Sequence, residues 1–194
     1  NILNIYTKDP EFRFFMSIQI LLIVACTLVM ISHQYFDSSW QDFEQVVFQA
    51  VSISTTTGYT TSNFAEWPSF VPMLLIIASF IGGCAGSVGG GLRVARILVL
   101  YLQGARELKR FVHPNLVYPI KWGKNVLDER VIGSIWAFFS AYLLVFTICL
   151  LSVIACGVTP FDAFNAVLAS INNLGPGLGS VSSNMTAMPD SAKW

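Results

Sequence analysis

Long apolar stretches alternate with short polar ones along this chain. The apolar stretches cover residues 14–31, 70–102 and 132–155. At a rise of about 1.5 Å per residue, each is long enough as a helix to cross a hydrocarbon layer of about 30 Å. The intervening segments 42–61 and 160–179 are too short and too polar to do so. The pattern therefore predicts three membrane crossings and two shorter helical segments that enter the membrane without spanning it.

The two shorter segments are similar in sequence. FEQVVFQAVSI, from Phe43, and FDAFNAVLASI, from Phe161, both begin with an aromatic residue and an acid and end in Ser-Ile, 118 positions apart (161 − 43). Arg13 and Arg130 each open an apolar stretch, 117 positions apart (130 − 13). An internal repeat of span, short helix, polar loop and span is typical of transporters.

The repeat predicts an all-α integral membrane protein made of span, pore-helix, span units with re-entrant filter loops. Residues 1–112 form the first pore repeat, whose second span is broken by glycines, and residues 113–129 form a cytoplasmic linker. Residues 130–194 form a second pore repeat without its final span.

Composition agrees with a membrane protein. Of the 194 residues, 54% are hydrophobic and only 11% are charged, against roughly 25% charged in soluble domains. The net charge of zero gives no reason to expect a nucleic acid partner. The apolar stretches contain no paired carboxylates, no Ser/His/Asp set and no cluster of metal ligands, so we expect neither an enzyme nor a bound cofactor. The cysteines all lie in apolar runs and are interpreted as reduced, packed side chains.

The basic residues predict the orientation. Of the 11 lysines and arginines, Lys193 alone lies on the other side from the rest, and the side rich in basic residues is cytoplasmic. The opposite side carries six acids, which should concentrate cations at the entrance of a pore. These acids are Asp37, Asp42, Glu44, Glu66, Asp162 and Asp190.

The stretch TTTGYTT follows the first short helix, predicted over 42–54, and is the first candidate ion filter. The helix end directs partial negative charge into the membrane, which favours a cation. Irregular backbone at that depth is tolerated where it lines a wet cavity, and Gly58 can adopt the positive φ that turns successive carbonyls to one side. The candidate filter residues are Thr55, Thr56, Thr57, Gly58 and Tyr59.

The second candidate filter is INNLGPGLG, which follows the second short helix. Aligning Gly58 with Gly175 gives an offset of 117 (175 − 58), so one residue is dropped between helix and filter. The two loops are then unequal linings of one pore, with asparagines where the first loop has threonines. The candidate residues are Asn172, Asn173, Leu174, Gly175, Pro176 and Gly177.

A glycine-rich block, GGCAGSVGGG at 82–91, interrupts the second apolar stretch. Glycines spaced four apart are also the pattern of closely packed membrane helices, and the spacing does not fit a phosphate-binding loop. We favour a loop that crosses the pore below the filter and acts as a gate. Its candidate residues are Gly82, Gly83, Gly86, Ser87, Gly89, Gly90 and Gly91.

Two arginines follow the glycine block at once. Arg93 and Arg96 could repel cations at the inner mouth, pair with acids of neighbouring repeats, or anchor at the interface by snorkelling. The segment 106–130 is basic and contains two prolines and several aromatic residues. It is interpreted as a solvated cytoplasmic loop that meets anionic membrane lipid.

SISTTTGYT, GGCAGSVGGGLRVARI and NNLGPGLG, in this order and spacing, closely resemble the last two of four repeats in TrkH-type potassium uptake proteins of the Trk/Ktr/HKT superfamily. The resemblance implies four repeats around a central pore in the bacterial inner membrane, and potassium as the transported ion, held by backbone carbonyls of the filter residues. It also implies a gating role for the glycine block, a homodimer, and a cytoplasmic ring of TrkA-type nucleotide-binding subunits.

We therefore expect passive potassium uptake through the filter, gated by the glycine-rich loop. Thr60 stands where TVGYG channels have a second glycine, so discrimination of potassium from sodium should be looser. Two loops do not enclose a fourfold pore, so the full protein or a second chain must supply the others. The alternatives are a two-pore-loop potassium channel that closes its pore as a dimer, and a polytopic membrane protein without a transport role.

Overall fold

The structure is a computed structural model that describes residues 8–35, 40–84, 86–87, 89–113, 118–123, 125–175, 177–179, 186 and 188–192. Its described part is mostly helical, with one small hairpin. The main helices are α2 (Pro10–Ser32), α3 (Trp40–Ser54), α4 (Phe70–Ser79), α5 (Val94–Val112), α6 (Glu129–Ala155) and α7 (Pro160–Ile171). The short elements are the 3-10 helices η1 (Phe64–Glu66) and η3 (Asp190–Ala192) and the strands β1 (Lys121–Trp122) and β2 (Asn125–Val126).

Local sequence fixes where three of these helices begin. The side chains of Asp9 and Asp128 accept hydrogen bonds of 3.1 Å from backbone N–H groups in the first turns of α2 and α6. Thr159 caps α7 in the same way, through a 3.2 Å bond from the N–H of Asp162. These caps satisfy donors that a helix leaves unpaired, and Pro10 and Pro160 occupy first-turn positions where no N–H is needed.

Two helices, α2 and α6, are long and apolar enough to cross a membrane, and they cover the first and third predicted crossings. The second predicted crossing is divided into α4 and α5, because the glycine block does not continue the helix. Much of α6 faces outward, and Leu144, Ile148 and Leu151 are more than half exposed. In a membrane protein such a surface contacts lipid or further protein.

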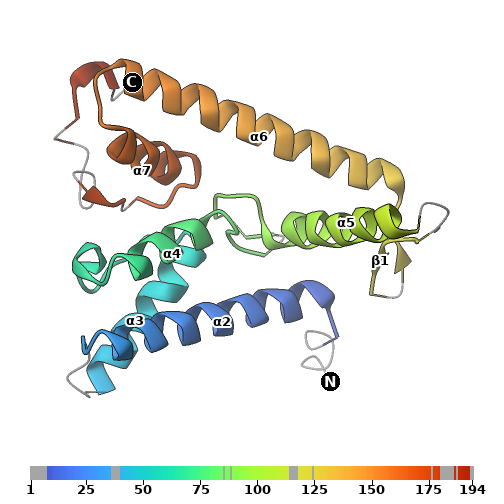
Figure 1. The fold of residues 1–194 in the computed structure, drawn as a ribbon, viewed down its shortest axis with the longest axis horizontal. Coiled ribbons are helices and arrows are strands. Elements are labelled where there is room, and N and C mark those ends of the chain that lie inside the picture. The colour runs from blue at the N-terminus through green and yellow to red at the C-terminus, as the bar shows by residue number, and fades with distance from the viewer. Residues whose placement is uncertain are drawn as a thin grey trace.

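The helices pack in pairs around a central layer. In Figure 1, α2 and α6 lie on opposite sides, and α4 and α5 follow each other between them. The helix α3 packs against α2 and α4, α7 packs against α6, and α5 contacts both α2 and α6. The core includes Cys26, Ile53, Leu75 and Leu168, from α2, α3, α4 and α7. The two short helices predicted from the sequence are α3 and α7, and both lie on the left in Figure 1.

The predicted linker contains a hairpin that the all-α prediction lacked. Strands β1 and β2 pair antiparallel, with Lys121 opposite Val126, and Gly123 has a φ of 59° in the turn. Ile120, just before β1, is buried against Val99 of α5 and Ile132 of α6. The described part of the linker thus packs on α5 and α6. The polar and charged sequence of this segment did not predict that packing.

Candidate functional site

The helix α3 ends in a left-handed turn that starts the first candidate filter. Thr56 has a φ of 57°, and its N–H donates to Ile53 O at 3.1 Å, while the N–H of Thr57 donates to Ser52 O at 2.8 Å. This pair of bonds is the Schellman arrangement that closes a helix C-terminus. Gly58, at φ 81°, then redirects the chain.

The helix α7 ends in the same backbone arrangement. Asn173 has a φ of 52°, its N–H donates to Ser170 O at 3.2 Å, and the N–H of Leu174 donates to Ala169 O at 2.8 Å. Gly175 follows at φ 87°. Each of these residues stands 117 positions after its counterpart in the first loop (173 − 56). The two loops therefore begin with the same backbone conformation. Pro176, also predicted for the filter, lies outside the described residues.

The backbone changes one detail of the sequence alignment. The N–H of Thr55 bonds Val51 O at 3.0 Å and the N–H of Asn172 bonds Leu168 O at 3.0 Å, already 117 positions apart within the last helical turn (172 − 55). The offset of 117 therefore already holds at the end of the helix, and no residue is dropped between helix and filter. Helical register is set by backbone hydrogen bonds and the cap, so the shared Ser-Ile pair did not mark equivalent positions.

Side chains hold the first loop to its helix. The hydroxyl of Ser52 donates to Tyr59 O at 2.6 Å, and Gln49 Nε2 donates to Ser62 O at 2.8 Å. The hydroxyl of Thr55 donates to Val51 O at 2.6 Å and lies 2.8 Å from the hydroxyl of Thr57. These bonds fix the shape of the loop, and the Tyr59 carbonyl accepts one of them. Tyr59 is 73% exposed.

In the second loop, Asn172 is fully buried and its side chain joins three helices. Its Oδ1 accepts a 2.7 Å hydrogen bond from the hydroxyl of Tyr142 on α6, and its Nδ2 donates to Ser79 Oγ on α4 at 3.3 Å. Ser79 in turn donates to Ile76 O. Asn173, by contrast, is exposed. Tyr142 and Ser79 were not predicted as site residues, although a hydroxyl in the middle of an apolar stretch was a signal.

The glycine block forms a closed loop between α4 and α5, at the centre of Figure 1. The N–H of Leu92 donates to Phe80 O at 3.0 Å and the N–H of Val94 donates to Gly83 O at 3.1 Å, which brings the two ends of the loop together. Gly86 has a φ of 90°, a conformation that side chains disfavour. Because none of the described residues of the block is helical, its four-residue glycine spacing does not form a packing stripe along a helix.

One glycine of the block touches both candidate filters. The N–H of Gly90 donates to Thr56 Oγ1 at 3.1 Å. A Cβ added to Gly90 would collide with the backbone of Asn172, including its carbonyl oxygen, and a Cβ on Gly89 would lie 2.8 Å from Thr56 Oγ1. The structure thus brings the two filter loops and the glycine block together at Gly90.

The two arginines after the block lie differently. Arg93 has a φ of 67° and precedes the first residue of α5. The guanidinium carbon of Arg96 lies 3.8 Å from the ring centroid of Phe138 on α6, a cation–π contact. Within the described residues, the arginines that form ion pairs with acids are Arg106 and Arg110. Of the roles predicted for Arg96, an ion pair with an acid is therefore not seen there.

The described residues contain no group of three or more His, Cys, Asp or Glu side chains that could hold a metal ion. The oxygens next to Gly89 and Gly90 are the backbone carbonyls of Thr55 and Asn172 and the hydroxyls of Thr56 and Ser87. Such neutral oxygens can replace part of the water shell of a large monovalent cation.

The comparisons agree on one group of proteins. A family model described as TrkH: Cation transport protein matches residues 4–194. The chain is 56% identical over 189 residues to the Trk system potassium uptake protein TrkH of Vibrio parahaemolyticus, covering 97% of this chain and 39% of that protein. It is 54% identical over 192 residues to TrkH of Escherichia coli strain K12, covering 99% and 40%. The crystal structure of the potassium transporter TrkH from Vibrio parahaemolyticus matches with a TM-score of 0.92 at 56% identity, covering 97% of this chain and 40% of that one. The chain thus spans about 40% of the length of these relatives.

Proposed function

Since the chain belongs to the TrkH family of cation transport proteins, we propose that it supplies two filter loops and a gate to a potassium uptake pore. Its relatives are named as potassium uptake proteins. The protein lies in the bacterial inner membrane, with 1–112 and 130–194 as pore repeats and 113–129 as the linker between them. The remaining loops around the central pore come from the rest of the full-length protein.

The observation that carries this proposal is the matched backbone of the two loops. Thr56 and Asn173 share a left-handed conformation, Gly58 and Gly175 share a positive φ, and both loops meet the glycine block at Gly90. A left-handed helix cap alone is common, so the weight lies on the matched positive φ of Gly58 and Gly175 after the cap and on the meeting of both loops at Gly90. Re-entrant filter loops arranged around one axis account for both.

The ion is held by backbone oxygens. Residues 55–59, 172–175 and 177 present carbonyls in place of the water shell, while the hydroxyl and amide side chains keep the loops in shape. In each loop two residues of positive φ flank one residue without it, and such alternation can turn neighbouring carbonyls toward a common side. No further cofactor takes part, and potassium is the transported ion.

The glycine block is the gate. In this structure Gly90 fits between Thr56 and the backbone of Asn172, where a larger residue has no room. When the glycine block moves, Gly90 leaves its position between Thr56 and Asn172, and the two filter loops are no longer blocked there. Arg93 and Arg96, just after the block, transmit this motion to α5. The cation–π contact of Arg96 with Phe138 couples that motion to α6.

Regulation comes from outside the membrane. The basic end of α5 and the linker face the cytoplasm, where a TrkA-type nucleotide-binding subunit docks. The full-length protein forms a homodimer. The membrane face of the basic end of α5 and the linker meets anionic lipid.

A pair of glycine variants tests the proposal. Gly175 and Gly157 have φ values of 87° and 88°, and an added Cβ meets nothing within 4 Å at either. Alanine therefore imposes the same backbone strain at both sites, roughly 1–2 kcal/mol for an L-residue in this conformation. The full-length gene with Gly175→Ala, with Gly157→Ala, or unchanged is expressed in a bacterium that lacks potassium uptake, and growth is followed on low potassium.

We expect the parent and Gly157→Ala to restore growth and Gly175→Ala to fail, although all three reach the membrane in equal amount. Gly157 lies between α6 and α7, outside the filter, so it reports the cost of strain alone. Equal growth of the two variants would mean that the backbone at Gly175 does not shape an ion path.

A further inference from the structure

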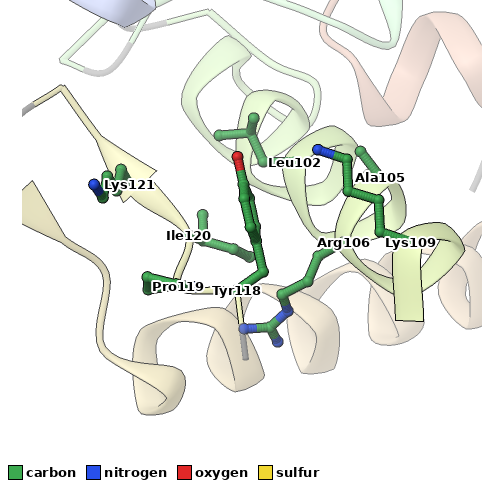
Figure 2. A pocket seen from close by; sticks show the side chains of 8 residues that line it. All are labelled: Leu102, Ala105, Arg106, Lys109, Tyr118, Pro119, Ile120 and Lys121. Carbon is green, nitrogen blue, oxygen red and sulfur yellow. The ribbon is translucent and has the colours of Figure 1, made fainter. Parts of the chain in front are cut away.

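Two pockets lie at one end of the molecule, where α2 begins, α5 ends and α6 begins, on the right in Figure 1. The first is shown in Figure 2, has a volume of about 260 Å³ and lies between α5 and the hairpin. A second, of about 350 Å³, lies between α2, α5 and the hairpin. Leu102 and Lys121 line both, so the two pockets adjoin.

The first pocket combines an apolar lining with basic groups at its edge. Its apolar part is formed by Leu102, Ala105, Pro119 and Ile120. In Figure 2, Lys109 and Lys121 lie on either side of Tyr118, and the Arg106 side chain points away from both. Such a site fits a molecule with an anionic head and an apolar body.

The charges in the pocket are only partly compensated. Arg106 donates to both carboxylate oxygens of Glu129, at 2.5 and 3.2 Å; these hydrogen bonds raise the pKa of Arg106, and the carboxylate compensates its positive charge. Lys109 lies 4.5 Å from the ring centroid of Tyr118 and, like Lys121, forms no ion pair with a described carboxylate. Two ammonium groups therefore remain available to an anion.

The location favours a lipid over a soluble ligand. The second pocket adds Arg13, Phe14 and Trp122, so that cations and aromatic rings surround the beginning of α2, one of the two apolar helices long enough to span. Phe111 and Tyr101 of α5 are 86% and 65% exposed nearby along the helix. Aromatic and basic residues gather in this way at the headgroup level of a bilayer.

We propose that the pocket between α5 and the hairpin binds the headgroup of an anionic phospholipid. The ammonium groups of Lys109 and Lys121 contact the phosphate, and the apolar lining receives the glycerol and the upper part of an acyl chain. Because the pocket lies on α5, the helix that follows the glycine block, an occupied pocket holds that helix against the hairpin. This inference rests on the membrane location and not on the identity of the transported ion.

The test is a lipid titration of the purified full-length protein. The melting temperature is measured in detergent with added phosphatidylglycerol, with phosphatidylcholine, and with inorganic phosphate alone. The variant Lys109→Gln/Lys121→Gln removes both pocket charges. The control Lys8→Gln/Arg130→Gln removes two exposed charges at the same end of the molecule that line none of these pockets.

We expect phosphatidylglycerol to raise the melting temperature of the parent and of the control, and phosphatidylcholine and phosphate to leave it unchanged. The pocket variant should need roughly tenfold or more phosphatidylglycerol for the same shift, given what each lysine contributes near an anionic surface. An equal loss in pocket variant and control would reduce the effect to general surface attraction and overturn the proposal. A shift by phosphate alone would assign the pocket to a soluble anion. Loss of regulatory-subunit binding in the pocket variant, with an unchanged lipid response, would assign it to protein docking.

Discussion

Asn172 shows how one side chain in the candidate filter links separate elements. It is buried, its amide bonds reach Tyr142 on α6 and Ser79 on α4, and its backbone lies against Gly90. A buried amide whose partner is removed keeps its desolvation cost without a compensating bond. The position therefore determines both stability and the shape of the second loop.

The contribution of the hydrogen bond to Asn172 can be tested by comparing two tyrosine substitutions. Tyr142→Phe removes the donor to a buried Oδ1, whereas Tyr35→Phe removes an exposed hydrogen bond of 2.7 Å to Glu66 O. We expect Tyr142→Phe to cost about 1–3 kcal/mol in the free energy of unfolding and Tyr35→Phe less than about 1 kcal/mol. Tyr142→Phe should also lower potassium uptake. Thermal unfolding and ion flux of the purified full-length proteins measure both effects, and equal costs would argue that Asn172 does not depend on Tyr142.

The second prediction at the residue scale concerns Gly90. An added Cβ at Gly90 has no room beside Asn172, while at Gly104 of α5 it meets nothing within 4 Å. If the block closes the pore in this arrangement, Gly90→Ala destabilises the closed state and raises uptake measured without the regulatory subunit. Gly104→Ala should leave uptake unchanged and stabilise α5 by roughly 1 kcal/mol. Flux into vesicles distinguishes these outcomes, and reduced flux through folded Gly90→Ala protein would contradict the gate.

At the scale of elements, the short helices depend on their ends. Thr159 caps α7 by accepting from the N–H of Asp162, and the opposite end of α7 carries the second candidate filter. The hydroxyl of Thr147 in α6 only donates back to Leu143 O. We expect Thr159→Ala to destabilise the protein by about 1 kcal/mol and Thr147→Ala by no more than about 0.5 kcal/mol, as measured by thermal unfolding. Equal effects would show that the cap does not determine the stability of α7.

Local sequence predicted the elements better than their contacts. The ends of the apolar stretches predicted α2 and α6 because length and hydropathy are properties of the segment itself. The glycine block predicted the break between α4 and α5 because glycine weakens a helix wherever it stands. The hairpin was missed because it depends on packing of Ile120 against Val99 and Ile132, which are distant in sequence.

In the candidate site, too, features set by residue type could be predicted, and features set by contacts between distant residues could not. The positive φ at Gly58 follows from the residue type and was predicted, and Gly175, aligned with Gly58 by sequence, also has a positive φ. The left-handed Thr56 and Asn173 follow from the helix caps, which the sequence did not mark. The network from Tyr142 through Asn172 to Ser79 joins residues up to 93 positions apart, and no local pattern predicts such a meeting.

At the scale of the whole molecule, charge and fold agree on orientation. The helix α2 starts and α5 ends at the end that carries most of the basic residues, and Tyr35 lies just beyond the other end of α2. Basic residues flanking apolar spans remain on the cytoplasmic side. Phe111, 86% exposed near the end of α5, should therefore face the cytoplasm, and Tyr35, 50% exposed, should face outward.

Cysteine labelling tests this orientation. In a full-length protein whose native cysteines are replaced by serine, Tyr35→Cys should react with a membrane-impermeant maleimide in intact cells, and Phe111→Cys should react only after the membrane is opened. Both positions are exposed, so neither result is limited by burial. The reverse pattern would place the basic pockets outside the cell, the acids that attract cations inside, and the candidate gate on the outer side of the filter. Orientation therefore decides whether the glycine block can control entry into the cytoplasm.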